Sequence, residues 1–298
     1  MVRKNKAYQL TANTVMLMVT LIVALPFLLL FMSSITDENT LLQNGYSFLP
    51  AKYSLGAYEY IFRSGGKILR AYGMTIMVTV IGTCVNVTMS ALFSYPLSLK
   101  NLPGRGPITF MVFFTMLFNG GLVPSYILWS NYLGVKDTAA GLILPNLLMN
   151  AMNILLIRTY FTTSIPDSLY EAAQIDGASQ MRVFLTIALP LGKPILVTIG
   201  TFSGLAYWND WTNGLYYISK NTNLYTIQNL LNKMVSDIQF LSQNSSNLSA
   251  DVALEISKVP STGIQMAIAF VAILPIIIVF PLLQKYYAKG ISLGAVKG

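Results

Sequence analysis

The sequence predicts an all-α membrane protein with six transmembrane helices, and three observations support this class. Hydrophobic residues make up 54% of the 298 residues and charged residues only 10%, whereas an average soluble domain is about 25% charged. Six apolar stretches recur along the chain, each close to the roughly 20 residues that a helix needs to cross a bilayer. Polar segments with Gly, Pro, Asn and Ser separate these stretches. We therefore expect residues 1–298 to form a single transmembrane domain.

The first expected span, residues 14–34, follows a basic N-terminus and carries no charge. A basic start before an apolar run is also typical of a signal peptide, but no small-x-small cleavage site is evident and further spans follow. We therefore expect an uncleaved first helix. Residues 35–70 are polar and contain the breakers Pro50 and Gly65-Gly66, which favour an external loop with short helices.

Five further charge-poor stretches complete the set of expected spans: 71–98, 108–129, 139–157, 195–217 and 263–283. Residues 218–262 are polar and rich in Asn and Ser, and they predict a second external loop. For this loop we favour a solvated surface over a binding role.

The segment 160–193, between the fourth and fifth expected spans, predicts two short helices joined by a turn. Pro166 suits the first position of a helix, because its missing N–H costs nothing there. Gly177 can adopt a positive φ and end that helix. A second helix is expected from Ser179 to Ala188, with Pro190 breaking it. The result is a helix–glycine–helix elbow outside the bilayer.

The charges between the spans predict which side of the membrane each loop faces. With six spans, both termini and residues 160–193 share a side that carries 11 of the 19 Lys and Arg residues and three acidic residues. The opposite side carries eight basic and eight acidic residues, although its loops are longer. Because cytoplasmic loops carry the excess of Lys and Arg, we expect the termini and the elbow in the cytoplasm. The net charge of +8 then reflects topology, not nucleic-acid binding.

The residue types exclude several classes of enzyme. The chain has no histidine, which removes imidazole bases, Ser-His-Asp triads and histidine metal sites. The single cysteine, Cys84, lies in an apolar run, so neither a disulfide nor a thiolate metal cluster is expected. Gly66-Lys67 and Gly192-Lys193 lack the first glycine and the hydroxyl residue of a phosphate-cradling loop. We expect no catalytic residue, metal or cofactor in this chain, so any ATP hydrolysis must come from a partner.

The elbow carries a long, spaced motif. It reads Glu171-Ala172-Ala173, three residues, Gly177, nine residues, Ile187, one residue and Leu189-Pro190. At every position this pattern resembles EAA-x3-G-x9-I-x-L-P, the cytoplasmic coupling loop of permease subunits in ATP-binding-cassette (ABC) importers. The alternative is an ordinary loop helix between two spans, since a motif is a hypothesis until its structural context agrees.

The resemblance implies the type I ABC importer permease fold and a docking role for the motif. Ala172 and Ala173 are small enough for a partner surface to approach the backbone closely. Glu171 offers a carboxylate to a basic residue of that partner, which favours register and specificity. Asp176 fits helix capping as well as partner contact. The other motif residues expected to shape the coupling loop are Gly177, Ile187, Leu189 and Pro190.

The C-terminal tail, Lys289-Gly290-x4-Ala295-Val296-Lys297-Gly298, is similar to that of maltose-type sugar permeases, in particular the six-span partner. This resemblance implies a multi-pass protein of the bacterial cytoplasmic (inner) membrane. It also implies a second, non-identical permease, two ATPase subunits that bind ATP and Mg, and an extracytoplasmic sugar-binding protein. In similar proteins the tail, here Lys297 and Gly298, reaches the ATPase pair.

Two further stretches resemble a branch that handles larger or acidic oligosaccharides: 118–124 and Trp208-Asn209-Asp210-Trp211. Rings and amides suit the apolar faces and hydroxyls of sugars, and an ionisable residue within a span is functional by default. The alternative is interfacial anchoring, because Trp is enriched at membrane–water interfaces. Asn119 is a further candidate for the cargo path, or part of a break in the third span that lets helices pack closely.

Two other functions compete with sugar import. A permease of the same machinery for peptides or amino acids would share the coupling motif, but the sugar-type tail argues against it. A secondary transporter predicts inverted repeats and several buried charges. The sequence shows no internal repeat, and only Asp210 approaches the second criterion.

Overall fold

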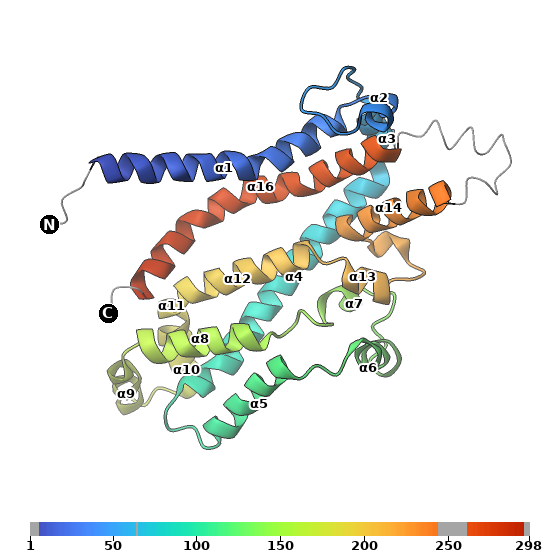
Figure 1. The fold of residues 1–298 in the computed structure, drawn as a ribbon. Coiled ribbons are helices and arrows are strands. Elements are labelled where there is room, and N and C mark those ends of the chain that lie inside the picture. Colours follow the sequence, from blue (N-terminus) through green and yellow to red (C-terminus); the bar gives the residue numbers. More distant parts are fainter. Residues whose placement is uncertain (1–5, 64, 244–260, 295–298) are drawn as a thin grey trace. The chain divides into compact units, whose positions relative to one another are not determined.

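The computed structural model (Figure 1) describes residues 6–63, 65–243 and 261–294. Within these ranges the chain is mostly helical, and its only β pairing is an isolated bridge between Thr36 and Tyr53. The chain divides into two compact units, Met1–Ile68 with Leu230–Ile277, and Leu69–Asn229 with Ile278–Gly298. The all-α class predicted from the sequence is confirmed for the described residues.

The first unit brings the N-terminal helices together with the first part of α16 (Ser261–Gly294). It contains α1 (Lys6–Ser34), α2 (Glu38–Asn44) and α3 (Gly56–Arg63). The Glu38 carboxylate accepts hydrogen bonds from the backbone N–H groups of Thr262 (2.9 Å) and Gly263 (2.8 Å). A carboxylate at a helix N-terminus is favourable, so α2 caps α16. The expected loop over 35–70 does hold short helices.

The second unit holds most of α4 (Gly65–Ser98) and the elements from α5 to η3. Gly65 and Gly66 were predicted to break the chain, but they begin α4 instead. The following elements are α5 (Arg105–Leu117), α6 (Leu122–Ile127), η1 (Leu128–Tyr132), α7 (Ala140–Ile143), α8 (Ala151–Ser164), α9 (Asp167–Ile175), α10 (Gln180–Val183), η2 (Phe184–Ala188), α11 (Leu189–Leu191), α12 (Lys193–Trp208), α13 (Thr212–Tyr217) and η3 (Thr222–Leu224). α14 (Ile227–Gln243) then crosses into the first unit.

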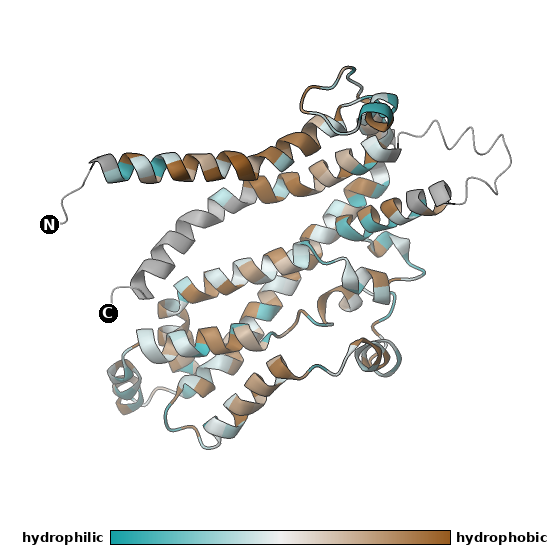
Figure 2. Ribbon diagram, in the orientation of Figure 1, coloured by the Kyte–Doolittle hydropathy of each residue, from teal (hydrophilic) through white to brown (hydrophobic). Residues whose placement is uncertain are grey.

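Two described helices are long and apolar enough to cross a membrane, Tyr8–Ser34 and Gly66–Ser98. Two bent pairs raise this to as many as four if each pair is one span: Arg105–Leu117 with Leu122–Tyr132, at 111°, and Gln180–Leu191 with Lys193–Trp208, at 78°. Thr262–Ile278 is apolar but shorter. The side chains of α1 are exposed in this chain and strongly apolar (Figure 2), as a lipid-facing helix requires. The count of six spans stays a prediction.

Two of the expected spans are not continuous helices. The stretch 108–129 is interrupted after Leu117, and helix resumes at Leu122. The Asn119 Oδ1 accepts a hydrogen bond from Gly121 N (2.8 Å), and Gly121 has a φ of 88°. The possible break at these residues is therefore confirmed, but a Cβ at Gly120 or Gly121 would meet no atom within 4 Å. Within this chain, close helix packing does not explain the glycines.

The stretch 139–157 is interrupted as well, between α7 and α8. Asn146 in this interruption has a φ of 62°. Non-helical backbone at membrane depth is tolerated only where protein buries it or where it lines a cavity. The partners of this segment's carbonyl groups therefore matter for function.

Candidate functional site

The first helix of the elbow, α9, begins one residue later than predicted. Pro166 lies at the N-cap with an extended ψ of 135°, and Asp167 is the first helical residue. At the other end, Gly177 has a φ of 74°. Gly177 N–H donates to the Gln174 carbonyl (3.0 Å) and Ala178 N–H donates to the Ala173 carbonyl (2.9 Å). This pair of bonds is the Schellman ending, so the predicted glycine end of the helix is confirmed.

The second helix of the elbow continues beyond Pro190, which corrects the prediction that it breaks there. Ser179 caps α10, its Oγ accepting from Arg182 N (3.3 Å). A π-helical turn, η2, then follows, in which Leu189 N–H donates to the Phe184 carbonyl. Proline clashes with the carbonyl four residues before it in a regular α-helix. The wider π turn accommodates Pro190 inside the helix.

The change of direction occurs at Gly192, between α11 and α12. A Cβ at Gly192 would lie 2.4 Å from Cε1 of Phe161 and 2.7 Å from the Ala188 carbonyl oxygen. No side chain fits there without a shift of backbone or of a buried ring. The corner that returns the chain from the elbow to α12 therefore depends on glycine at this position.

The elbow is packed onto α4 through one aromatic side chain, Tyr95. Its ring contacts Tyr170 of α9 edge-on (6.2 Å between centroids) and Phe184 of η2 (5.2 Å). Its hydroxyl donates to Oε1 of Gln180 on α10 at 3.0 Å. Burial raises the pKa of Tyr170 to about 12. Both arms of the elbow therefore pack against the same residue of α4.

The opposite face of α9 is exposed. It presents Glu171, Ala172 and Asp176, together with Ile175, whose side chain is 86% exposed. Ala173 instead packs against the buried cluster, as do Ile187 and Leu189. The motif therefore divides into residues that hold the elbow in place and residues available to a partner.

In the second unit, side chains from α4, α12 and α13 bind the carbonyls of the non-helical segment between α7 and α8. Asn86 Nδ2 donates to the carbonyls of Leu147 (2.7 Å) and Leu148 (3.2 Å). The Tyr207 hydroxyl donates to the Ile143 carbonyl (2.9 Å). The Pro145 carbonyl accepts from Asn213 Nδ2 (2.9 Å). These bonds satisfy backbone groups that a continuous helix would satisfy internally.

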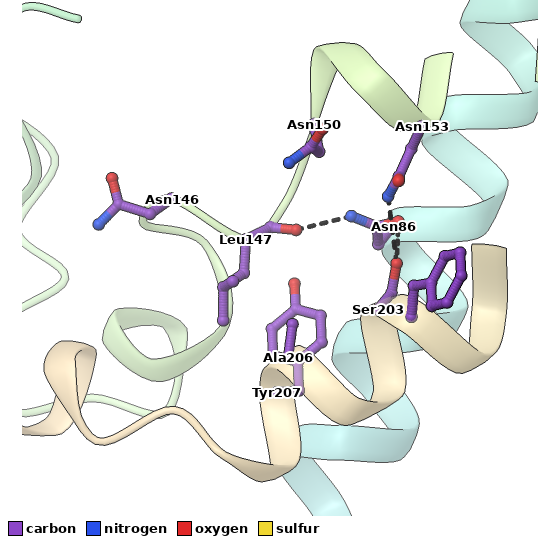
Figure 3. Close-up of a pocket in the computed structure, with 9 residues that line it drawn as sticks. Asn86, Asn146, Leu147, Asn150, Asn153, Ser203, Ala206 and Tyr207 are labelled. Carbon is purple, nitrogen blue, oxygen red and sulfur yellow. Dashed lines mark hydrogen bonds between the residues drawn. The ribbon is translucent and has the colours of Figure 1, made fainter. Parts of the chain in front are cut away.

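A cavity of about 130 Å³ lies beside this segment. Figure 3 shows Asn86 of α4, Asn153 of α8 and Ser203 of α12 meeting on one side of it. Ser203 Oγ donates to Asn86 Oδ1 (2.8 Å), and Asn153 Nδ2 donates to Ser203 Oγ (3.3 Å). Asn146 and Asn150 also line the cavity. Its polar lining is uncharged and rich in amides, which suits a ligand with many hydroxyl groups.

The tryptophan-rich candidates lie where α12 ends. Asp210 Oδ1 accepts from the backbone N–H groups of Thr212 (3.0 Å) and Asn213 (3.3 Å), so it caps α13. Asn209 bonds back to the Leu205 carbonyl (2.9 Å), and Trp211 is 45% exposed. The buried Nε1 of Trp208 has no hydrogen-bond partner among the described residues.

The comparisons with known proteins identify the family. Residues 4–293 match the family described as "Binding-protein-dependent transport system inner membrane component". The chain belongs to this family. It is therefore the inner membrane permease component of a transporter that works with a substrate-binding protein.

Two relatives and one solved structure are similar over almost the whole permease. The polygalacturonan/rhamnogalacturonan transport system permease protein YtcP of Bacillus subtilis (strain 168) is 36% identical over 295 residues, 99% of this chain and 100% of YtcP. Protein LplC of the same organism is 36% identical over 277 residues, 93% of this chain and 90% of LplC. A chain from the crystal structure of a bacterial ABC transporter involved in the import of the acidic polysaccharide alginate matches with a TM-score of 0.77 and 27% identity, covering 96% of this chain and 99% of that chain.

Not every site residue predicted for the permease can be placed. Lys297 and Gly298 lie outside the described residues. No hydrogen bond of the described residues joins Asn119 to the Trp208–Trp211 group. Sequence reasoning missed Tyr95 and Ser203, for which no local signal exists. It also missed Asn86, although an amide in a charge-free span is costly unless it is bonded or functional, and this was a usable signal.

Proposed function

We propose that this permease carries an oligosaccharide into the cytoplasm as one of two non-identical membrane subunits of an ABC importer. The observation that carries the proposal is the similarity over almost its full length to YtcP, which is named for polygalacturonan and rhamnogalacturonan transport. The match to a component of an alginate importer points the same way. Both names refer to acidic polysaccharides, so acidic oligosaccharides are the first cargo to test.

The elbow is proposed to couple ATP hydrolysis by partner ATPases to movement of α4. Its exposed residues would dock on an ATPase subunit, which binds ATP and Mg, while this chain needs no cofactor of its own. Tyr95 lies nine residues after Asn86 on α4, a distance of about 14 Å along the helix. One rigid helix thus joins the docking element to the cavity wall, so displacement of the elbow would move Asn86 and the segment that it binds.

The asparagine-lined cavity and the end of α12 are proposed to form this subunit's part of the cargo path. Discontinuous helices beside a cavity are typical of transport sites. The amides of Asn146 and Asn150, with the indole of Trp208, supply hydrogen-bonding groups for sugar hydroxyls. Trp211 supplies an exposed ring for an apolar sugar face.

The proposed topology has six spans with both termini and the elbow in the cytoplasm. Residues 35–70 and 218–262 would then face outward. The test is labelling of single cysteines at Ser179 and Asn221 in a Cys84→Ser background with a membrane-impermeant maleimide. Labelling from outside at 221 and only after permeabilisation at 179 is expected, and the reverse result contradicts the topology.

The cargo is tested with the whole importer in proteoliposomes. The complex is reconstituted with its sugar-binding protein outside and ATP inside, and uptake of labelled oligogalacturonides is compared with that of a neutral oligosaccharide and a dipeptide. ATP-dependent uptake of an oligosaccharide is expected, with ADP inside as the control. Uptake of the dipeptide alone would exclude a carbohydrate permease.

A further inference from the structure

Two arginines from different helices converge on one carbonyl at the end of α4. Arg105, the first residue of α5, and Arg158, on α8, each donate an Nε–H to the Leu97 carbonyl at 3.0 Å. Sharing one acceptor holds the two guanidinium groups close together. Their terminal N–H groups make no further hydrogen bond among the described residues.

Nothing in the described part of the chain neutralises this pair. Its only ion pairs there are Lys52 with Asp37 and Lys100 with Asp167. Asp167, the acidic residue closest to Arg158 in sequence, is therefore already engaged. The first turn of α5 contains no acidic residue, although the positive end of a helix favours one. Two guanidiniums and a helix N-terminus together attract an anion.

A groove of about 560 Å³ leads away from the two arginines between α5 and α8. Its walls include Phe110, Phe113 and Leu155, and Phe110 is 63% exposed. Thr109 lies one turn after Arg105 in the same groove, and its buried Oγ1 has no hydrogen-bond partner among the described residues. The groove thus combines an anion site and a vacant polar partner with an apolar surface.

We propose that this groove binds an anionic phospholipid. The phosphodiester would lie between Arg105 and Arg158, where each guanidinium offers a fork of N–H donors. Thr109 Oγ1 would donate to a phosphate or ester oxygen, and an acyl chain would cover the two phenylalanines. A phospholipid supplies the charge and the hydrocarbon in one molecule, and the membrane surrounds this protein with such molecules. Basic pockets between membrane helices are a known setting for anionic headgroups.

Lipid binding to the purified importer complex tests the proposal directly. The complex is delipidated in mild detergent and titrated with phosphatidylglycerol or phosphatidylcholine bearing the same acyl chains, and bound lipid is counted by native mass spectrometry. Each arginine near a headgroup strengthens binding about fivefold, so phosphatidylglycerol should bind at least about tenfold more tightly. Arg105→Gln with Arg158→Gln should abolish this preference. Arg182→Gln, which removes an exposed arginine of α10, is the matched control and should retain it.

A second variant keeps the test decisive if the double arginine variant does not assemble. Phe113→Trp fills the groove and leaves both arginines in place, so it should weaken phosphatidylglycerol binding severalfold in an intact complex. Unchanged preference in Phe113→Trp would overturn the proposal. Loss of the second permease subunit from this variant would also overturn it, because the groove would then be a protein interface. Equal competition by inorganic phosphate would reduce the site to a simple anion site and would likewise contradict it.

Discussion

The Tyr95 hydroxyl on α4 donates a hydrogen bond of 3.0 Å to Oε1 of Gln180 on α10. The two residues are 85 positions apart in sequence, and the same tyrosine ring also contacts both arms of the elbow. A displacement of α9 or α10 is therefore transmitted to α4 through packed side chains.

Tyr95→Phe should weaken coupling while the membrane core still folds. The change removes one hydrogen bond, worth about 0.5–1.5 kcal/mol, and keeps the ring contacts. Cargo transported per ATP hydrolysed by the reconstituted complex should fall, and it should fall further in Tyr95→Ala, which also leaves a cavity. Tyr132→Phe, at a side chain that is 80% exposed, is the control. Equal effects at the two positions would contradict a specific role for Tyr95.

Gly177→Ala should misdirect the second arm of the elbow. The φ of 74° places the residue in the left-handed region, where a side chain costs about 1–2 kcal/mol. No atom lies within 4 Å of the added Cβ, so the effect comes from backbone strain alone. Co-purification of the ATPase subunits should decrease. Gly73→Ala, equally open and without positive φ, should leave it unchanged, and the same result for both would argue against the left-handed turn as the cause.

Glu171→Lys should weaken docking of the ATPase subunits. Glu171 is exposed on α9, and reversing its charge places a cation opposite the basic surface that we expect on the partner. The measurement is the yield of ATPase subunits bound to the affinity-tagged permease, at low and high salt. Glu59→Lys, which makes the same change on α3 of the first unit, is the control. Full docking of the Glu171 variant at low salt would rule out this contact.

Asn86→Leu should disrupt the segment between α7 and α8. The change leaves the Leu147 and Leu148 carbonyls and the Ser203 hydroxyl without their partner, at about 1–3 kcal/mol for each buried group. Transport should fall and the melting temperature of the purified complex should drop. Asn101→Leu, at an exposed asparagine, should change neither. A normal melting temperature in Asn86→Leu would mean that other groups hold the segment.

Asp210 separates helix capping from cargo contact, because two substitutions differ in only one of these functions. Asp210→Asn keeps an oxygen for the Thr212 and Asn213 N–H groups but removes the charge. Asp210→Ala also removes the cap, at about 0.5–2 kcal/mol. If the carboxylate contacts sugar hydroxyls, both variants should transport less and only Asp210→Ala should melt earlier. Normal transport by Asp210→Asn would leave Asp210 with capping alone.

Local patterns in the sequence predicted the helical class, the motif of the elbow and its glycine ending. These features depend on composition, on a fixed spacing and on the φ angles that glycine alone adopts easily. The break after Leu117 was foreseen from Asn119 and Gly120-Gly121 for the same reason. The prediction for Pro190 was wrong because a neighbouring π turn changed the space available to the proline ring.

The contacts of Tyr95, Asn86 and Arg105 became visible only in the tertiary structure. Each joins helices that are distant in sequence, through a hydroxyl, an amide or a guanidinium whose partner cannot be read from its neighbours along the chain. The break between α7 and α8 is stable because Asn86, Tyr207 and Asn213, from three other helices, bind its carbonyls. Sequence by itself determined which segments are helical and which residues face a partner at the elbow. Packing decided where the helices break, because the free energy of an unpaired backbone carbonyl depends on which side chain reaches it.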